Sequence, residues 1–229
     1  MTDESLSTPA TPSLYMPRQF ASTELAHALT IMRQHPLATF TSTDDDGFPF
    51  VSYLPIYAET QPDAAGGDTL TLWGHLSRAN PHWKLLAQRP QALVAFRGAH
   101  SYLSPSVYPD VQRVPTWNYV AVHCHVQVEL VDDPEDKDSL LKCLIGEHEP
   151  AYAEQWRGLD ADYTRKMLAA IVGMRMRVLR WDCKLKLNQH RTESVDAMRA
   201  AYQAHAELGD DNAAELLQWM ERLHMRQAG

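Results

Sequence analysis

The stretch WNYVAVHCHVQVELV, residues 117–131, decides the fold because apolar and polar side chains alternate along its length. One face carries the apolar set Val120, Val122, Cys124, Val126, Val128 and Leu130. The other face carries Trp117, Tyr119, Ala121, His123, His125, Gln127 and Glu129. A period of two residues is typical of a β-strand that is buried on one side. This is the strongest strand signal in the chain.

Outward from this strand, further strands are expected at residues 37–43, 48–58, 69–75, 92–98 and 173–187. Helices are expected from Ser22 to about residue 35, at 80–88 after Asn80, from Asp133 to about 147, from Asp160 to about 172, and from Thr192 and Asp210 onward. Residues 99–115 contain three prolines and predict a long ordered loop.

The order of these elements favours one class of fold. The first two thirds are mostly strands with inserted helices, the last third is helical, and no β-α-β alternation supports a parallel sheet. We therefore predict a mainly β protein with peripheral helices (α+β), built as a partly closed antiparallel barrel. The predicted division is a disordered lead-in at 1–14, a barrel domain at 15–190 and a helical extension at 191–229.

Composition excludes several classes of function. The 229 residues are 45% hydrophobic and carry a net charge of −8, so the chain as a whole does not attract nucleic acid. It has no run of about 18 apolar residues and no basic-then-apolar leader, which predicts a cytoplasmic protein without a membrane span. The three cysteines, Cys124, Cys143 and Cys183, form no C-x-x-C pair and are expected to be buried free thiols.

A second stretch, WGHLSRANPHWK at residues 73–84, is the best candidate for an anion site. A strand leads into a turn with Ser77 and Arg78, and Asn80 and Pro81 then begin a helix. Arginine is a two-pronged donor to phosphate, and a serine hydroxyl and helix N–H groups are further donors. The alternative is that Arg78 is a surface cation and Ser77 a turn residue.

Other candidate chemistry is weaker. His123 and His125 share a strand face and could bind a metal, but the sequence suggests no third or fourth ligand, so we assign no metal. No nucleophile elbow or other recognisable catalytic serine or cysteine is present, so no catalytic residue is assigned. The tryptophans and tyrosines near the corner could stack on a flat cofactor or belong to the core.

Several motifs together resemble the PaiB-type FMN-binding negative transcriptional regulators. They are YMPRQF (15–20), WGHLSRANPHWK (73–84), SYLSPSVY (101–108), VPTWNYVAVH (114–123) and KLKLNQ (184–189). The resemblance covers residues 15–195. It implies a homodimeric FMN-binding split barrel, similar to pyridoxamine-phosphate oxidases and flavin reductases, with FMN at the dimer interface.

The resemblance also implies which residues contact FMN. His75, Ser77 and Arg78 correspond to phosphate contacts, Ser52, Tyr53 and Leu54 to contacts with the ring and ribityl chain, and Asn118 and Gln189 to contributions from the other motifs. The chain departs from the family pattern at Ala79, where a second cation is usual. It also departs at residues 186–190, which read KLNQH instead of KLSQN.

Three classes of function remain open on the sequence. The protein could be a flavin-dependent oxidoreductase acting on a small molecule, a regulator in which FMN is structural or senses redox state, or a barrel without flavin. The family name implies the regulator. Direct binding to DNA is doubtful, because the sequence has an acidic balance and no helix-turn-helix signature.

Overall fold

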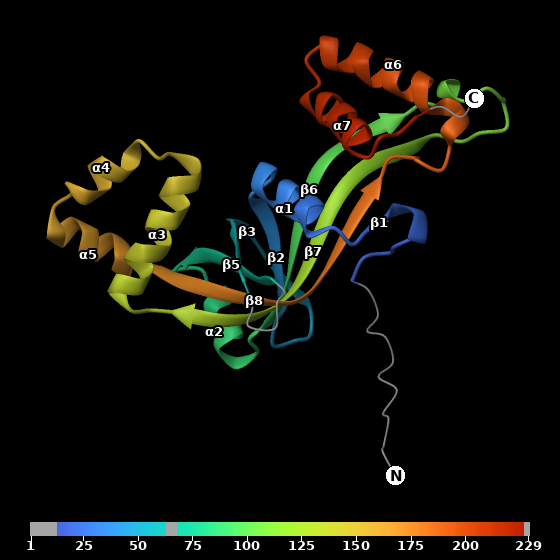
Figure 1. Ribbon diagram of the computed structural model, residues 1–229. Helices are drawn as coiled ribbons and strands as arrows, with labels where there is room; N and C mark the ends of the chain where they lie inside the picture. The colour runs from blue at the N-terminus through green and yellow to red at the C-terminus, as the bar shows by residue number, and fades with distance from the viewer. Residues whose placement is uncertain (1–12, 63–67, 227–229) are drawn as a thin grey trace.

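The computed structural model describes residues 13–62 and 68–226, and these form one antiparallel sheet flanked by helices (Figure 1). The strands are β1 Ala21–Ser22, β2 Leu37–Thr43, β3 Pro49–Pro55, β4 Tyr57–Pro62, β5 Asp68–Ser77, β6 Gln91–Leu103, β7 Thr116–Val131 and β8 Ile171–Lys186. Their order in the sheet is β3-β2-β6-β7-β8-β5-β4, and β1 pairs with β8.

The helices are α1 Leu25–Gln34, α2 His82–Gln88, α3 Pro134–His148, α4 Tyr152–Arg157, α5 Ala161–Ala169, α6 Val195–Glu207 and α7 Asp211–Arg222, with the 3-10 turns η1 Arg18–Phe20, η2 Pro105–Val107 and η3 Thr192–Ser194. The group α3–α5 lies at one end of the long β7–β8 ribbon, and α6–α7 lie near the other end (Figure 1). The predicted mainly β architecture with peripheral helices is confirmed.

The strand β7 lies between β6 and β8 at the centre of the sheet, as its alternation predicted. Val120, Val122, Cys124, Val126 and Val128 are all buried in the core, while the side chains between them face the other side of the sheet. The sheet curls until β3 and β5 approach each other beside Gly74. A Cβ atom there would lie 2.7 Å from Cδ1 of Ile56, so any larger residue would require the Ile56 side chain to move.

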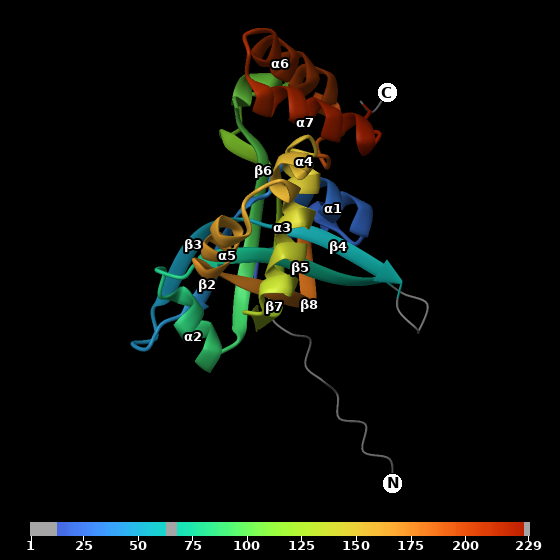
Figure 2. The same cartoon turned by 90° about the vertical axis from the view of Figure 1, so that its left-hand side faces the viewer.

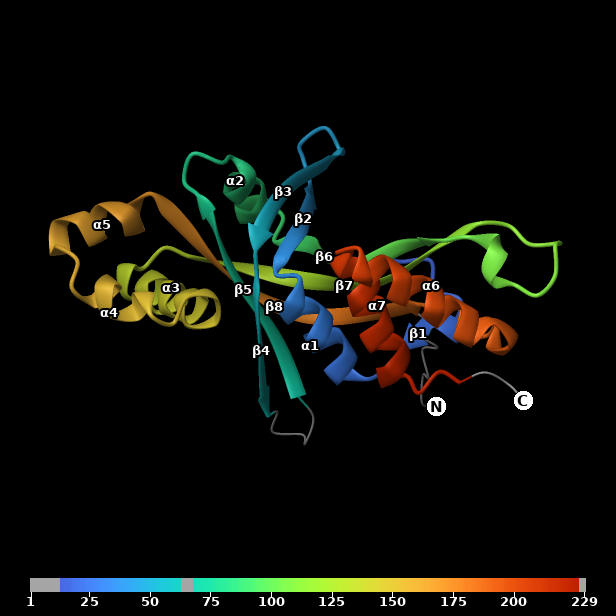
Figure 3. The ribbon, with the colours of Figure 1, turned by 90° about the horizontal axis from the view of Figure 1, so that it is seen from above.

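The view from above shows β4 and β5 crossing the long ribbon at a steep angle (Figure 3). The 90° turn in Figure 2 shows α2 below the sheet and α6 and α7 above it. Met198, Tyr202, Leu216, Trp219 and Met220 of these last two helices belong to the same continuous core as the barrel strands.

Several predicted boundaries are wrong, and each has a local cause. Residues 99–103 are not loop but continue β6, because a register shift between Arg97 and His100 lets the strand bend and pair further with β7. The strand expected at 48–58 is two strands, β3 and β4, separated at Ile56. The helix expected up to residue 172 ends at Ala169, and Ile171 and Val172 pair in β8.

Other differences concern helix ends and thiols. Ser22 lies in β1 and α1 begins only at Leu25, after Glu24, whereas Asp133, Asp160 and Asp210 cap their helices as predicted. Helix α4 was not predicted. Cys124 and Cys183 are buried free thiols, but Cys143 on α3 is exposed. Residues 1–12 of the predicted lead-in lie outside the described residues. In the described part of the chain, each helix is too short or too polar to cross a bilayer.

The close packing around Gly98 predicts that alanine substitutions at two glycines differ in their effect on stability. A Cβ on Gly98 of β6 would lie 2.5 Å from Cγ2 of Val120 and 3.3 Å from Ile31 of α1, so Gly98→Ala should destabilise the protein by about 1–3 kcal/mol. Gly146→Ala is the matched control, because nothing lies within 4 Å of its Cβ position on α3. It should be neutral or stabilise by up to about 1 kcal/mol. Urea unfolding measures both, and equal stabilities for the two variants would contradict this packing.

Candidate functional site

The candidate anion site is a tight corner between β5 and α2. The N–H of Asn80 donates to the carbonyl of Ser77 at 2.9 Å, and the N–H of Ala79 donates to Oγ of Ser77 at 3.3 Å. Oδ1 of Asn80 accepts from the N–H of His82 at 3.0 Å, as a capping side chain does, although the helix itself starts one residue later than predicted. Because α2 has only seven residues, side chains rather than a long helix dipole must supply most of an anion's partners.

A buried histidine fastens this corner to the barrel. Nε2 of His82 lies 2.9 Å from Oγ of Ser42 on β2, and its Nδ1 lies 2.9 Å from Oγ of Ser52 on β3. Nδ2 of Asn80 also donates to Oγ of Ser52, at 3.0 Å. The ring of His82 is fully buried beside Phe40 and Phe50, and this burial lowers its pKa to about 4. A neutral imidazole therefore joins two strands and the corner.

The three predicted residues on β3 have different environments. Ser52 is buried, and its hydroxyl is used in the His82 network. Leu54 is also buried and packs in the core, so only its backbone can reach a ligand. Tyr53 is 69% exposed and lies on the outer face of the sheet. Of the three, Tyr53 is the residue whose side chain is free to contact a bound ring.

His75 lies on the same outer face, two residues before Ser77 on β5. Its Nδ1 is buried and has no hydrogen-bond partner within residues 13–62 and 68–226. Burial lowers the pKa of His75, so the ring is neutral at pH 7. A buried polar atom without a partner is costly, and a polar group of a ligand is one way to satisfy it.

Arg78 is already held by protein groups. Its Nη2 donates to Asp132 and, at 3.0 Å, to the carbonyl of Ile171, and its Nε donates to the carbonyl of Ala169 at 3.1 Å. The hydrogen bonds from Arg78 and from Lys137, whose Nζ lies 3.0 Å away, lower the pKa of Asp132. Arg78 is thus an oriented cation rather than a loose surface one. Its Nη1 makes no hydrogen bond to the described part of the chain.

Asn118 and Gln189 lie at the opposite end of the ribbon. Asn118 is fully buried, and its Nδ2 donates to the hydroxyl of Tyr202 on α6 at 2.9 Å. Oε1 of Gln189 accepts from the N–H of Leu187 at 3.0 Å, and its Nε2 donates to two backbone carbonyls at 2.8 Å. The structure therefore brings His75, Ser77 and Arg78 together and leaves Asn118 and Gln189 far from them.

The structure also reveals site residues that were not predicted. His82 and Asn80 are the support of the corner, and the signal was the sequence NPHW, which we interpreted only as a helix start. A second feature is Lys184, whose Nζ donates to the carbonyl of Tyr15 at 2.7 Å and lies between the rings of Tyr15 and Tyr119.

The His-x-His pair of β7 is engaged with other groups. His123 lies 3.4 Å from Oγ of Ser13, and His125 lies 2.7 Å from Nη2 of Arg180. Among residues 13–62 and 68–226, no three His, Cys, Asp or Glu side chains come close enough to hold one metal ion.

The buried His82 predicts a specific pH dependence. Its pKa is about 4 in the folded chain, below the ordinary value of 6.5, so the unfolded chain takes up its proton first as the pH falls. Its contribution to stability is therefore complete above pH 6.5 and is lost progressively between pH 6.5 and 4. His82→Gln should lower stability at pH 7 and flatten this loss, whereas the exposed control His148→Gln should keep the wild-type slope. An unchanged slope in His82→Gln, measured by denaturant unfolding at several pH values, would refute the neutral ring.

Comparisons with known proteins identify the family and the fold of the chain. The family model described as "Putative FMN-binding domain" matches residues 14–180. The protease synthase and sporulation protein PAI 2 of Bacillus subtilis (strain 168) is 27% identical over 210 residues, which cover 91% of this chain and 97% of that protein. The predicted resemblance to the PaiB-type proteins is thus confirmed.

Two solved structures share the fold. The flavocytochrome Anf3 from Azotobacter vinelandii has a TM-score of 0.57 at 19% identity, covering 74% of this chain and 72% of that one. The FAD and heme binding protein from Mycobacterium smegmatis has a TM-score of 0.55 at 21% identity, covering 72% and 73%. These similarities support the split-barrel architecture predicted from the sequence. Since the family model matches most of the chain, the protein belongs to the FMN-binding domain family.

Proposed function

We propose that the protein is a dimeric flavoprotein in which the corner of His75, Ser77 and Arg78 holds the phosphate of FMN. Membership of the FMN-binding family supports FMN as the cofactor. The observation that carries the proposed position is the buried Nδ1 of His75, which lacks a partner in the described structure and lies on the outer face beside Ser77 and Arg78. When bound, FMN supplies electron transfer.

The donors at this corner fit a single phosphate. The side chain of Ser77 is exposed, and the neutral ring of His75 lies next along the strand. Arg78 has five N–H donors in a rigid fork. Asp132 and the carbonyls of Ala169 and Ile171 use Nε and Nη2 and fix the plane of the guanidinium, which leaves the two N–H groups of Nη1 for an anion. The ion pair therefore orients Arg78 and leaves N–H groups that can donate to an anion.

The other predicted contacts support a site shared by two copies of the chain. His75 pairs with Gly173 of β8, and Gly173 pairs with Val131 of β7, thirteen residues beyond Asn118. At about 3.3 Å per residue along the strand, Asn118 lies roughly 40 Å from His75, a distance longer than an FMN molecule. The 184–189 motif and Asn118 could meet the same FMN as Arg78 only from a second protomer.

For the biological role, we propose an FMN-dependent regulator of the PaiB type. Flavin-dependent oxidation or reduction of a small molecule is the alternative. The net charge of −8 favours regulation through a small molecule or a protein rather than through direct contact with DNA. Turnover of a reductant separates the two roles, because an oxidoreductase shows it and a regulator does not. DNA affinity that falls steeply with salt would contradict regulation without direct DNA contact.

The phosphate corner predicts a loss that is specific to FMN. Arg78→Ala removes a charge-assisted contact worth roughly 1.5–3 kcal/mol, so FMN affinity should fall by about one to two decades. Riboflavin, which lacks the phosphate, should bind wild type and variant equally well. Ser77→Ala should show a smaller loss of the same kind. Fluorescence titration with both flavins measures this.

Asp132→Asn is the matched control for the Arg78 variant. It removes the negative charge but keeps the guanidinium and an oxygen that can accept from it, so FMN affinity should fall less than in Arg78→Ala, while stability falls because the nearly buried Lys137 loses its charged partner. Equal FMN affinity in wild type and Arg78→Ala would contradict the proposed contact between Arg78 and the phosphate. A parallel loss of riboflavin affinity would assign Arg78 a purely structural role.

The shared site predicts a dimer at micromolar concentration. Exposed apolar side chains lie on the sheet, among them Val51, Tyr53, Tyr102, Trp117 and Leu179. Trp117→Arg should weaken dimerisation by about tenfold or more, because a tryptophan at an interface centre contributes strongly. Tyr163→Arg, at an exposed aromatic of α5, should have no effect. Light scattering across a dilution series checks this, and a wild-type monomer would contradict the two-copy site.

A further inference from the structure

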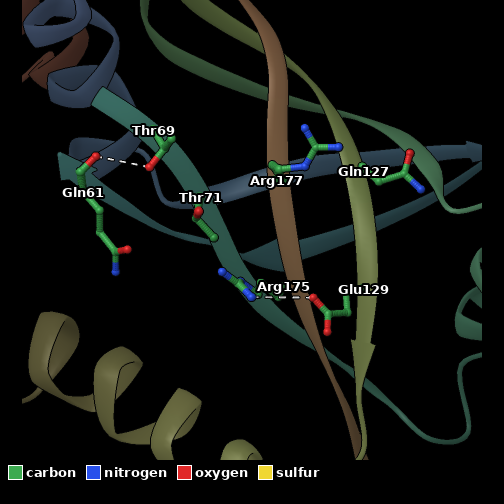
Figure 4. Close-up of a pocket in the computed structure, with 7 residues that line it drawn as sticks. All are labelled: Gln61, Thr69, Thr71, Gln127, Glu129, Arg175 and Arg177. Atoms are coloured by element: carbon green, nitrogen blue, oxygen red, sulfur yellow. Dashed lines mark hydrogen bonds and ion pairs between the residues drawn. The ribbon is translucent and has the colours of Figure 1, made fainter. Parts of the chain in front are cut away.

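A cavity of about 340 Å³, lined by polar and charged residues, lies on the outer face of the sheet (Figure 4). Strands β4, β5, β7 and β8 supply its lining, which consists of Gln61, Thr69, Thr71, Gln127, Glu129, Arg175 and Arg177. Thr71 lies six residues before Ser77 on β5, so the cavity is roughly 20 Å from the corner along the same strand face. Two arginines, two hydroxyls and two amides thus surround one hollow.

Strand register explains why these donors converge. Arg177 of β8 pairs with Thr71 of β5 on one side and Gln127 of β7 on the other. Arg175, two residues earlier on the same face, pairs with Trp73 and Glu129. Side chains directly opposite each other on a sheet face have Cβ atoms about 4.5–5.5 Å apart. The hydroxyl, amide and guanidinium groups can therefore donate to the same head group of a ligand.

Arg175 is held in place by its neighbours. Its Nη1 lies 3.7 Å from Oε2 of Glu129, and its guanidinium lies 5.6 Å from the ring of Trp73. The indole N–H of Trp73 in turn donates to Glu59 at 2.9 Å. The dashed line in Figure 4 marks this ion pair between Arg175 and Glu129. This arginine therefore has a carboxylate partner already, though at a long distance.

Arg177 differs from Arg175 in having no carboxylate partner. No hydrogen bond or ion pair joins its guanidinium to residues 13–62 or 68–226, and its neighbours in the lining are neutral Thr71 and Gln127. Here the cavity keeps a net positive charge, two arginines against Glu129, in a protein of net charge −8.

A second cavity continues the first toward α3. It has a volume of about 380 Å³ and shares Gln61, Glu129 and Arg175 with the first cavity. Its other lining residues are the carboxylates of Glu59 and Asp136, the polar side chains of Ser139 and Cys143, and the apolar groups of Trp73, Val131 and Leu140. The two cavities together form a groove that is cationic and hydroxyl-rich at Arg177 and acidic, with some apolar groups, at the end toward α3.

From this arrangement we infer that the first cavity binds a small organic anion, with its carboxylate or phosphate head at Arg177 and away from the carboxylates of the second cavity. Arg177 provides the two-pronged donor for the head, and Thr71 and Gln127 provide neutral donors beside it. Arg175 adds positive charge while Glu129 keeps it oriented. The inference concerns a second anion site and does not depend on where FMN binds.

Calorimetric titration of the full-length, FMN-treated protein with phenyl phosphate, benzoate and inorganic phosphate tests the site. Phenyl phosphate and benzoate distinguish the two head groups, and inorganic phosphate measures the head without a body. Arg177→Gln should weaken binding of the preferred probe by at least about tenfold. Thr71→Val, which removes a hydroxyl without changing charge or shape, should weaken it by a smaller factor. Arg165→Gln, at an exposed arginine of α5 paired with Asp162, should leave it unchanged.

Three results would overturn the inference. One is the absence of binding of all three probes to the wild type at millimolar concentration, which includes the case in which a second copy covers this face. Another is an equal loss in Arg177→Gln and Arg165→Gln, which would mean that only overall charge matters. The third is a loss in Arg78→Ala as large as in Arg177→Gln, which would place the anion at the phosphate corner. Failure of the FMN titrations alone leaves this test intact.

Discussion

The pairing of β7 with β8 is the constraint on which the rest of the structure depends. Both strands have 16 residues, and their side chains alternate between a core face and an outer face. The core face joins the barrel to α6 and α7 in one hydrophobic core. The outer face carries Arg175, Arg177 and Lys184. Because side chains alternate with a period of two, a shift of one residue would move Val120, Val122, Val126 and Val128 out of the core and disrupt both faces together.

Much of this architecture follows from patterns of short range. The alternation at 117–131 and the capping residues Asp133, Asp160 and Asp210 identify their elements because the decisive interactions lie within a few residues. The wrong predictions of element boundaries have long-range causes. Residues 99–103 form strand only because β7 offers a partner, and Ile171 joins β8 only because β5 does. No local propensity reports such partners.

The candidate site shows the same division. The sequence WGHLSRAN indicated an anion corner, and the structure brings His75, Ser77 and Arg78 together there. The sequence could not show that Asp132, 54 residues away, orients Arg78. Nor could it show that Ser42 and Ser52 bind the ring of His82. These contacts join separate strands and depend on sheet order. Asn118 and Gln189, predicted from family motifs, occupy the far end of the ribbon, which makes a shared two-copy site the arrangement that accommodates all the predicted contacts.

Sedimentation of the FMN-treated protein, followed at the visible absorption of the flavin, tests the central claim most directly. It reports cofactor binding and assembly on the same molecules. The account predicts that all protein-bound flavin sediments with a dimer, at one FMN per protomer, and that diluting the protein until the dimer dissociates releases the flavin. Flavin that sediments with a monomer, or that stays bound when the dimer dissociates, would contradict a site built from two copies.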